Sequence, residues 1–143
     1  MEAYEKLYQV LFKYDFDVHF RHFDRYFKAI KLLGKCGKNE HWLDCACGSG
    51  YGTRLLADFC SHVTGFDIKE KAVAYAREKY GSAATRFTTN DDEFGDNSFD
   101  AVVSIETIEH MKPDQARDLL ASINGWLKPG GSMIITTPLV PRS

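Results

Sequence analysis

Features that would assign a protein to a membrane, secretory or repeat class are missing from this sequence. No apolar run approaches the roughly 18 residues that suggest a membrane-spanning helix. The acidic, polar start, MEAYEKLYQV, lacks a signal-peptide pattern, and there are no repeats or low-complexity segments. The 143 residues, 44% of them hydrophobic and 13% aromatic, have the composition of one folded domain. We therefore expect a cytoplasmic globular protein without a membrane partner.

A basic surface stripe and paired metal ligands are also missing. The formal net charge is −2, and residues 86–114 hold eight acidic residues against two basic ones. Because nucleic-acid binding depends largely on neutralising phosphates, nucleic acid is a poor candidate for a partner. The four cysteines, Cys36, Cys45, Cys47 and Cys60, form no CxxC pair and have no His-x3-His partner. We expect no metal site, and reduced, buried thiols.

Helix and strand signals alternate along the chain. Apolar and aromatic residues at helical spacing predict two helices within residues 3–33, broken near residues 15–18. The predicted strands span residues 41–45, 62–67, 85–89, 99–105 and 132–137, and the predicted helices run from the glycine-rich loop to about residue 60, over residues 69–80, and from residue 113 to about residue 127. This order predicts the α/β class, with a Rossmann-like, doubly wound parallel sheet whose ligand lies at the carboxyl ends of the strands.

The stretch WLDCACGSGYGT, residues 42–53, joins the first predicted strand to a helix through three glycines at alternate positions, Gly48, Gly50 and Gly52. Glycines let the backbone adopt positive φ and let a ligand lie against bare peptide N–H groups, and the helix start adds a partial positive charge. The GxGxG spacing differs from the GxGxxG of dinucleotide enzymes. With Asp67 at the tip of the next strand, the stretch indicates a site for a nucleotide-like ligand.

Five separated stretches, HFRHFDRY, LDCACGSGYGT, VTGFDI, DNSFDAVVSIETIEH and LKPGGSMIITTP, together resemble the class I S-adenosylmethionine-dependent methyltransferases. The match extends from about residue 19 to residue 138, and it is most similar to small bacterial members associated with sugar and cell-surface biosynthesis. The resemblance implies an enzyme that transfers a methyl group from S-adenosylmethionine to a small molecule or sugar, leaving S-adenosylhomocysteine. The alternative is a non-catalytic module or subunit that binds either molecule, and nicotinamide-dependent redox chemistry is disfavoured by the glycine spacing.

The resemblance also implies which residues surround the cofactor. Those around its methionine part are Asp44, Cys47, Gly48, Ser49 and Gly50. The alternative for Asp44 is that it caps the glycine loop.

For the adenosine part, the resemblance implies that Asp67 binds the ribose hydroxyls and that Ile68 packs on the adenine. Asp91, with the backbone of Asp92, would meet the adenine amino group. The alternatives are that Asp67 is a helix N-cap and that the acidic loop is an ordinary solvated turn. This loop is also about four residues shorter than is usual in the family.

The resemblance implies that Ser104 and Glu106, at the end of the fourth strand, face the methyl-transfer region. Arg25 and Tyr26 match an Arg-Tyr pair in the preceding helix, from which a cation can reach the cofactor carboxylate. The alternative for Arg25 is a surface or structural charge.

A general base is optional in such a reaction. Orientation of the reacting groups can lower the barrier by about 7–11 kcal/mol, whereas a base typically adds about 10²–10⁴-fold in rate. Glu106, Glu109 and His110 are the candidates, because all three follow the fourth strand at the ligand edge. His110 can instead pack beneath the site as a structural residue.

The predicted organisation is an N-terminal helical segment, residues 1–40, a cofactor-binding core, residues 41–138, and a tail, residues 139–143. Family members normally continue with an antiparallel hairpin, which this chain lacks, so we expect an incomplete acceptor site. The end, LVPRS, resembles the cleavage sequence of a tag-removal protease, which indicates a vector remnant or the boundary of an expressed piece. The fifth strand would then be an open edge through which homo-oligomers can form.

Overall fold

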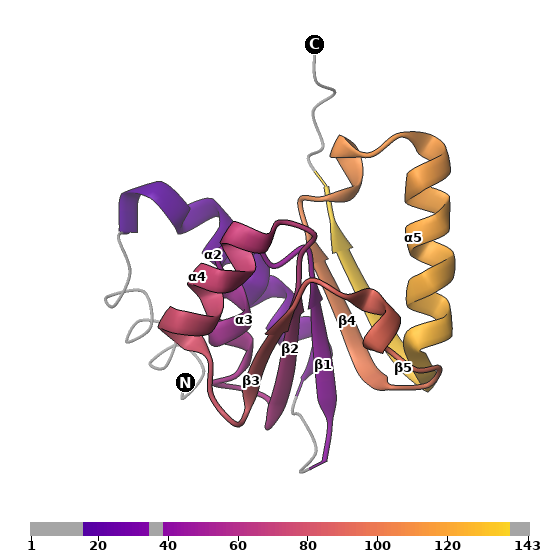
Figure 1. Cartoon of the computed structure of the whole chain (residues 1–143), viewed down its shortest axis with the longest axis horizontal. Coiled ribbons are helices and arrows are strands. Elements are labelled where there is room, and N and C mark those ends of the chain that lie inside the picture. Colours follow the sequence, from indigo (N-terminus) through magenta and orange to yellow (C-terminus); the bar gives the residue numbers. More distant parts are fainter. Residues whose placement is uncertain (1–15, 35–38, 138–143) are drawn as a thin grey trace.

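A computed structural model describes residues 16–34 and 39–137 of the chain. Its elements in chain order are α2 (Phe16–Leu33), β1 (His41–Cys45), α3 (Tyr51–Leu56), β2 (His62–Phe66), α4 (Glu70–Tyr80), β3 (Thr85–Thr88), the 3-10 turn η1 (Asp91–Glu93), β4 (Phe99–Ile105), the 3-10 turn η2 (Ile108–His110), α5 (Pro113–Trp126) and β5 (Leu127–Thr136) (Figure 1). The predicted first helix, Cys36 and the predicted tail lie outside the described residues.

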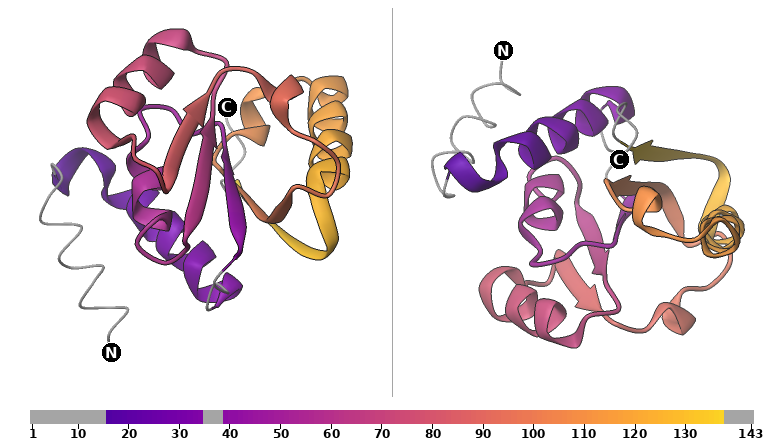
Figure 2. Two further views of the ribbon diagram at one scale, coloured as in Figure 1. Left: turned by 60° about the horizontal axis from the view of Figure 1, so that its bottom comes forward. Right: turned by 90° about the horizontal axis from the view of Figure 1, so that it is seen from above.

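All five strands run parallel, in the order β3-β2-β1-β4-β5. Helices α2, α3 and α4 lie on one face of the sheet and α5 lies on the other (Figure 2, right). The predicted Rossmann-like, doubly wound α/β fold is therefore confirmed. Among residues 16–34 and 39–137, no helix has the length and apolar character that a bilayer crossing requires.

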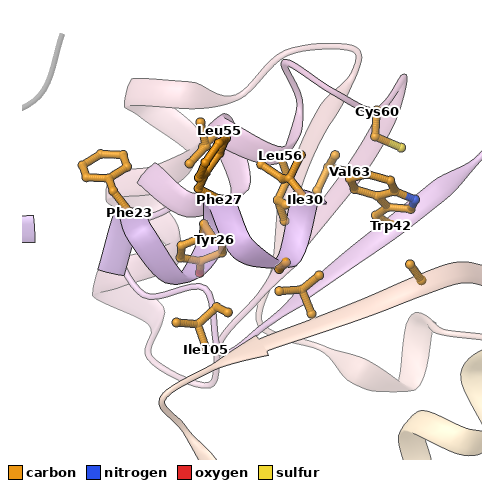
Figure 3. Packing of buried hydrophobic residues seen from close by; sticks show 13 residues of the cluster. Phe23, Tyr26, Phe27, Ile30, Trp42, Leu55, Leu56, Cys60, Val63 and Ile105 are labelled. Atoms are coloured by element: carbon orange, nitrogen blue, oxygen red, sulfur yellow. The ribbon is translucent and has the colours of Figure 1, made fainter. Parts of the chain in front are cut away.

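Buried side chains fill both sides of the sheet. On the side of α2 and α3, Phe23 and Phe27 lie in one buried cluster with Leu55, Leu56 and Trp42 (Figure 3). The helical spacing of these two aromatic residues thus places both side chains on the face of α2 that packs on the sheet. A second cluster, on the side of α5, consists of Leu43, Cys45, Phe66, Phe99, Val102, Ile123 and Trp126. Strand β4 is buried along nearly its whole length, which explains why its sequence is an almost continuous apolar run.

Several predicted boundaries differ from the structure, three of them by three residues or more. Helix α2 begins at Phe16, so residues 16–18 are helical where a break was predicted. Helix α3 ends at Leu56 rather than near residue 60. The segment LKPGG, predicted as a turn, belongs to β5, whose pairing with β4 is irregular between Phe99 and Ala101. A positive φ of 80° at Gly130 lets the chain bend there while it stays beside β4.

The two edges of the sheet differ. At β3, the Arg77 Nε donates to the Phe87 carbonyl at 3.0 Å, and the Ser82 N–H donates to the Thr85 carbonyl at 3.0 Å. The Thr85 N–H in turn donates to the Ser82 hydroxyl at 3.1 Å. At the other edge, β5 pairs only with β4 among the described residues, and Met133 is 43% exposed. Side chains and a turn therefore block the β3 edge, while no residue within 16–34 or 39–137 covers the edge of β5, which is called the open edge below.

Candidate functional site

A cavity of about 470 Å³ opens where the carboxyl ends of β1, β2 and β4 meet. Four of the predicted site residues, Asp67, Ile68, Glu106 and His110, line this cavity. The remaining lining residues, which the sequence analysis did not single out, are Cys45, Ala46, Phe66, Lys69, Thr107, Met111 and Leu119. Cys45 and Phe66 are the last residues of strands, and Ala46, Lys69 and Thr107 lie within three residues after a strand end. This position is the signal that could have found these five residues. Below, this space is called the front cavity.

The glycine loop and Asp67 are in direct contact. The Gly48 N–H donates to Oδ2 of Asp67 at 2.9 Å, and the Lys69 N–H donates to Oδ1 at 3.0 Å. Gly48 and Gly50 have positive φ values of 56° and 92°. A Cβ built on Gly48 would have nothing within 4 Å, so this part of the loop faces open space. Asp67 thus joins the loop to the start of α4, and Lys69, rather than Asp67, is the N-cap residue of α4.

Asp44 lies behind the glycine loop and is fully buried. Its carboxylate accepts hydrogen bonds from the Tyr26 hydroxyl, at 3.0 and 3.1 Å, and from the Thr53 hydroxyl at 2.7 Å. Burial raises the pKa of Asp44 to about 7, although the bonds from Thr53 and Tyr26 act in the opposite direction. Burial also raises the pKa of Tyr26 well above its usual value. Through these contacts Asp44 holds α2 and α3 together beneath the loop.

Arg25 pairs with Glu106 through its Nε. The Glu106 side chain is 10% exposed, and its backbone, with a φ of 52°, turns sharply as β4 ends. The Glu106 N–H donates to both the carbonyl and the hydroxyl of Thr136, each at 3.1 Å. The positive charge of Arg25 is therefore engaged by a residue of the front cavity. Consecutive residues of α2 tie this helix to the ends of β4 and, through Tyr26, of β1.

The other predicted cofactor residues are dispersed. Ile68 is 79% exposed at the front cavity, and the buried Ser104 hydroxyl has no hydrogen-bond partner among the described residues. Asp91 and Asp92 are exposed on η1 and do not line the front cavity. The Asp92 N–H donates to the side chain of Asn90 at 3.1 Å, which caps this turn.

Two residues of the loop itself differ in exposure. Cys47 is buried and Ser49 is partly exposed. Burial raises the pKa of the Cys47 thiol, and it raises the pKa of Cys45 to about 12. Both thiols are therefore protonated and poor nucleophiles.

Among the described residues, no three His, Cys, Asp or Glu side chains gather as metal ligands would.

Glu109 and His110 follow Glu106 on η2. The His110 Nε2 lies 3.6 Å from Oε1 of Glu109, and both carboxylate oxygens of Glu109 are buried without a hydrogen-bond partner among the described residues. The His110 side chain is about half exposed and lines the front cavity. Of the three predicted base candidates, Glu106 and His110 therefore border the cavity, and Glu109 lies behind them.

A parallel sheet with a glycine-rich first turn, an acid at the tip of the second strand that contacts this turn, and a cavity at the carboxyl ends of the strands defines a Rossmann-like ligand-binding protein. A family model described as a methyltransferase domain matches residues 43–135. The chain belongs to the class I S-adenosylmethionine-dependent methyltransferase family.

Named relatives agree with this family. The chain is 36% identical over 121 residues to phosphoethanolamine N-methyltransferase 2 of Caenorhabditis elegans, covering 80% of the chain and 27% of that protein. It is 36% identical over 109 residues to a probable S-adenosylmethionine-dependent methyltransferase of Mycolicibacterium smegmatis, covering 76% and 41%. A solved structure of Haemonchus contortus phosphoethanolamine N-methyltransferase 2 in complex with S-adenosyl-L-methionine matches with a TM-score of 0.69 and 30% identity, over 80% of the chain and 28% of that protein. The chain thus spans less than half the length of each.

Proposed function

We propose that this chain binds S-adenosylmethionine in the front cavity and serves methyl transfer to a small molecule. The observation that carries the proposal is the contact between Gly48 and Asp67, which places the glycine loop directly beside a carboxylate that lines the front cavity. Membership of the methyltransferase family supports the choice of this cofactor over a dinucleotide.

The residues of the front cavity fit the parts of this cofactor. Asp67 already accepts two N–H bonds, but a carboxylate has about four acceptor positions, so it can also bind ribose hydroxyls. The exposed Ile68 offers an apolar surface for the adenine. The open face of Gly48 leaves room for a ligand against the loop. The predicted contacts of Asp44 and Tyr26 would act through the loop, because both side chains are buried behind it.

For methyl transfer, the chain has to orient an acceptor rather than activate the donor. The sulfonium of S-adenosylmethionine supplies an electrophilic methyl group when the cofactor is bound. Glu106, held in place by Arg25, and His110 are the polar side chains near which an acceptor would be aligned. Positioning of this kind contributes about 7–11 kcal/mol, so a general base from Glu106, Glu109 or His110 would be an addition.

A small acceptor suits the dimensions of the site. A volume of about 470 Å³ lies in the range of small-molecule sites, and much of it would be taken by the cofactor. Relatives named as phosphoethanolamine, demethylmenaquinone and O-methyltransferases support a small molecule in general, and they do not select a sugar.

Calorimetry with S-adenosylhomocysteine tests the proposed site. We expect Asp67→Ala to weaken binding by about 1.5–3 kcal/mol, which is the value of hydrogen bonds to a charged group. Asp114→Ala is the matched control, because Asp114 is exposed on α5 and does not line the front cavity. Equal affinity of Asp67→Ala and the wild type would remove Asp67 from the site. Binding without turnover of labelled S-adenosylmethionine against a panel of acceptors would favour the non-catalytic alternative.

A further inference from the structure

A second and larger cavity, of about 680 Å³, borders the edge strand β3. It shares no lining residue with the front cavity. Helix α5 covers this face of the sheet next to β4 and β5, whereas beside β1, β2 and β3 no α-helix among the described residues lies on it (Figure 2, right). Below, this space is called the rear cavity.

The rear cavity has a polar floor and an aromatic wall. His41, Thr64 and Arg86 come from three adjacent strands, with Thr64 directly opposite Arg86 in the register. The His41 Nε2 and the Thr64 hydroxyl lie 2.7 Å apart. Phe94 and Phe99 form the wall, with ring centroids 5.2 Å apart in an edge-to-face arrangement. A ligand in this space would therefore meet hydrogen-bonding groups on one side and aromatic rings on the other.

Two arginines border the rear cavity without an acidic partner. Arg25, Arg54 and Arg117 each pair with a carboxylate. In the part of the chain that the structure describes, neither Arg77 nor Arg86 does so. Because Arg77 uses only its Nε for the Phe87 carbonyl, its two terminal nitrogens remain available as donors.

The charge around the rear cavity is positive on balance. Glu93 is the one carboxylate among its described lining residues, against Arg77 and Arg86. The pKa of His41 is lowered by burial first and then by the nearby charge of His62, with Lys128 and Arg86 acting in the same direction and Asp100 opposing them. His41 is therefore neutral near pH 7. In this form one ring nitrogen is a hydrogen-bond donor and the other is an acceptor.

We propose that the rear cavity is a second binding site, for an organic phosphate monoester that carries an aromatic ring. The guanidinium groups of Arg86 and Arg77 would bind the phosphate, since the planar guanidinium fork matches phosphate oxygens. The ring of the ligand would pack against Phe94 and Phe99. Two cations suit a dianion, and the volume lies in the range of small-molecule sites.

Titration of the chain with phenyl phosphate, followed by amide NMR, tests this proposal. We expect saturable shifts confined to residues around the rear cavity, and binding that is at least about tenfold tighter than that of inorganic phosphate or phenol, because both halves of the probe contribute. Saturating S-adenosylhomocysteine should not displace the probe, so the result does not depend on the front cavity. Absence of saturation at millimolar concentrations, or displacement by S-adenosylhomocysteine, would overturn the proposal.

Substitution of Arg86 locates the phosphate. Arg86→Gln should weaken phenyl phosphate binding by about tenfold or more, because a charge-assisted bond is lost. Arg117→Gln is the matched control, since Arg117 is exposed on α5 and pairs with Asp114. Unfolding curves of both variants should match the wild type, which separates loss of binding from loss of the fold. Wild-type affinity in Arg86→Gln would refute the assignment.

Discussion

The hydroxyl of Tyr26 donates to both carboxylate oxygens of Asp44, at 3.0 and 3.1 Å, and both residues are buried. This contact joins α2 to β1, the strand that leads into the glycine loop. Because a buried carboxylate that loses a donor has no water to replace it, the stability of the loop depends on this helix.

Tyr26→Phe should lower the free energy of unfolding by about 1–3 kcal/mol, the cost of leaving a buried acceptor without a donor. Urea denaturation measures this change. Tyr75→Phe is the matched control, because Tyr75 is 48% exposed and its hydroxyl bonds only Lys79 among the described residues. We expect that variant to stay within about 0.5 kcal/mol of the wild type. Equal effects of the two substitutions would contradict this account of the contact.

The pKa of Asp44 predicts a decrease in stability with rising pH. In the folded chain this pKa is raised to about 7 from its usual value of 3.8, so between these values the folded state binds more protons than the unfolded state. Stability should therefore fall as the pH rises through this window and level off above it, with a total of about 4 kcal/mol at 1.36 kcal/mol per pKa unit.

Asp44→Asn isolates this effect, because asparagine has nearly the same shape and does not titrate. The difference in unfolding free energy between this variant and the wild type should shift in favour of the variant between about pH 4 and about pH 8. Urea denaturation at several pH values gives this difference directly. A difference that stays constant over the window would show that Asp44 does not titrate as described.

Two glycines of the loop should respond differently to alanine. Gly50→Ala should destabilise the fold by about 2–5 kcal/mol, because φ is 92° and the new Cβ would lie 2.6 Å from that of Ala76 and 2.9 Å from the Phe87 ring. Gly48→Ala should lower the free energy of unfolding by only about 1–2 kcal/mol, the cost of placing alanine at a φ of 56°. Its Cβ would have no atom within 4 Å, so no steric clash adds to this cost.

Affinity for S-adenosylhomocysteine completes this comparison. Gly48→Ala should weaken binding by about tenfold or more while the chain remains folded, because its methyl group would stand on the open side of the loop, against which we propose that the ligand lies. Calorimetry on the folded variant measures the loss. Unchanged affinity in Gly48→Ala would place the ligand elsewhere.

We propose that the open β5 edge pairs with a second copy of the chain. Sedimentation should then show association that increases with protein concentration, and Met133→Lys should reduce it, because lysine on an edge strand opposes pairing. Tyr75→Lys is the matched control, since Tyr75 is 48% exposed on α4, which packs beside β3 at the opposite edge of the sheet. A monomeric wild type at high concentration, or equal effects of both lysines, would exclude this mode of association.

Local sequence signals were sufficient for most of the sheet. The bounds of β1 and β4 were predicted at the observed residues, since each is an apolar run between polar or turn-forming residues. That the glycine loop and Asp67 lie near each other was expected as well, because the ends of neighbouring parallel strands meet at one edge of the sheet. Their direct hydrogen bond was not predicted. The start of β5 was missed, because Pro-Gly-Gly reads as a turn even where it forms an irregular strand.

Contacts made by α2 could not be predicted in this way. Arg25 was expected to reach the cofactor carboxylate, and it pairs with Glu106, which lies far along the chain. Nothing near Tyr26 in the sequence indicates that its hydroxyl faces Asp44. The position of a helix against the sheet depends on how all of its buried side chains pack together, and a single sequence does not contain that arrangement explicitly.

The blocked edge at β3 has a consequence for how this sheet can grow. Since Ser82 already bonds both outward backbone groups of Thr85 and Arg77 bonds the carbonyl of Phe87, a new strand cannot add there without displacing them. Any additional strand, from the same polypeptide or from another molecule, must therefore join beside β5, which gives the sheet a single direction of extension.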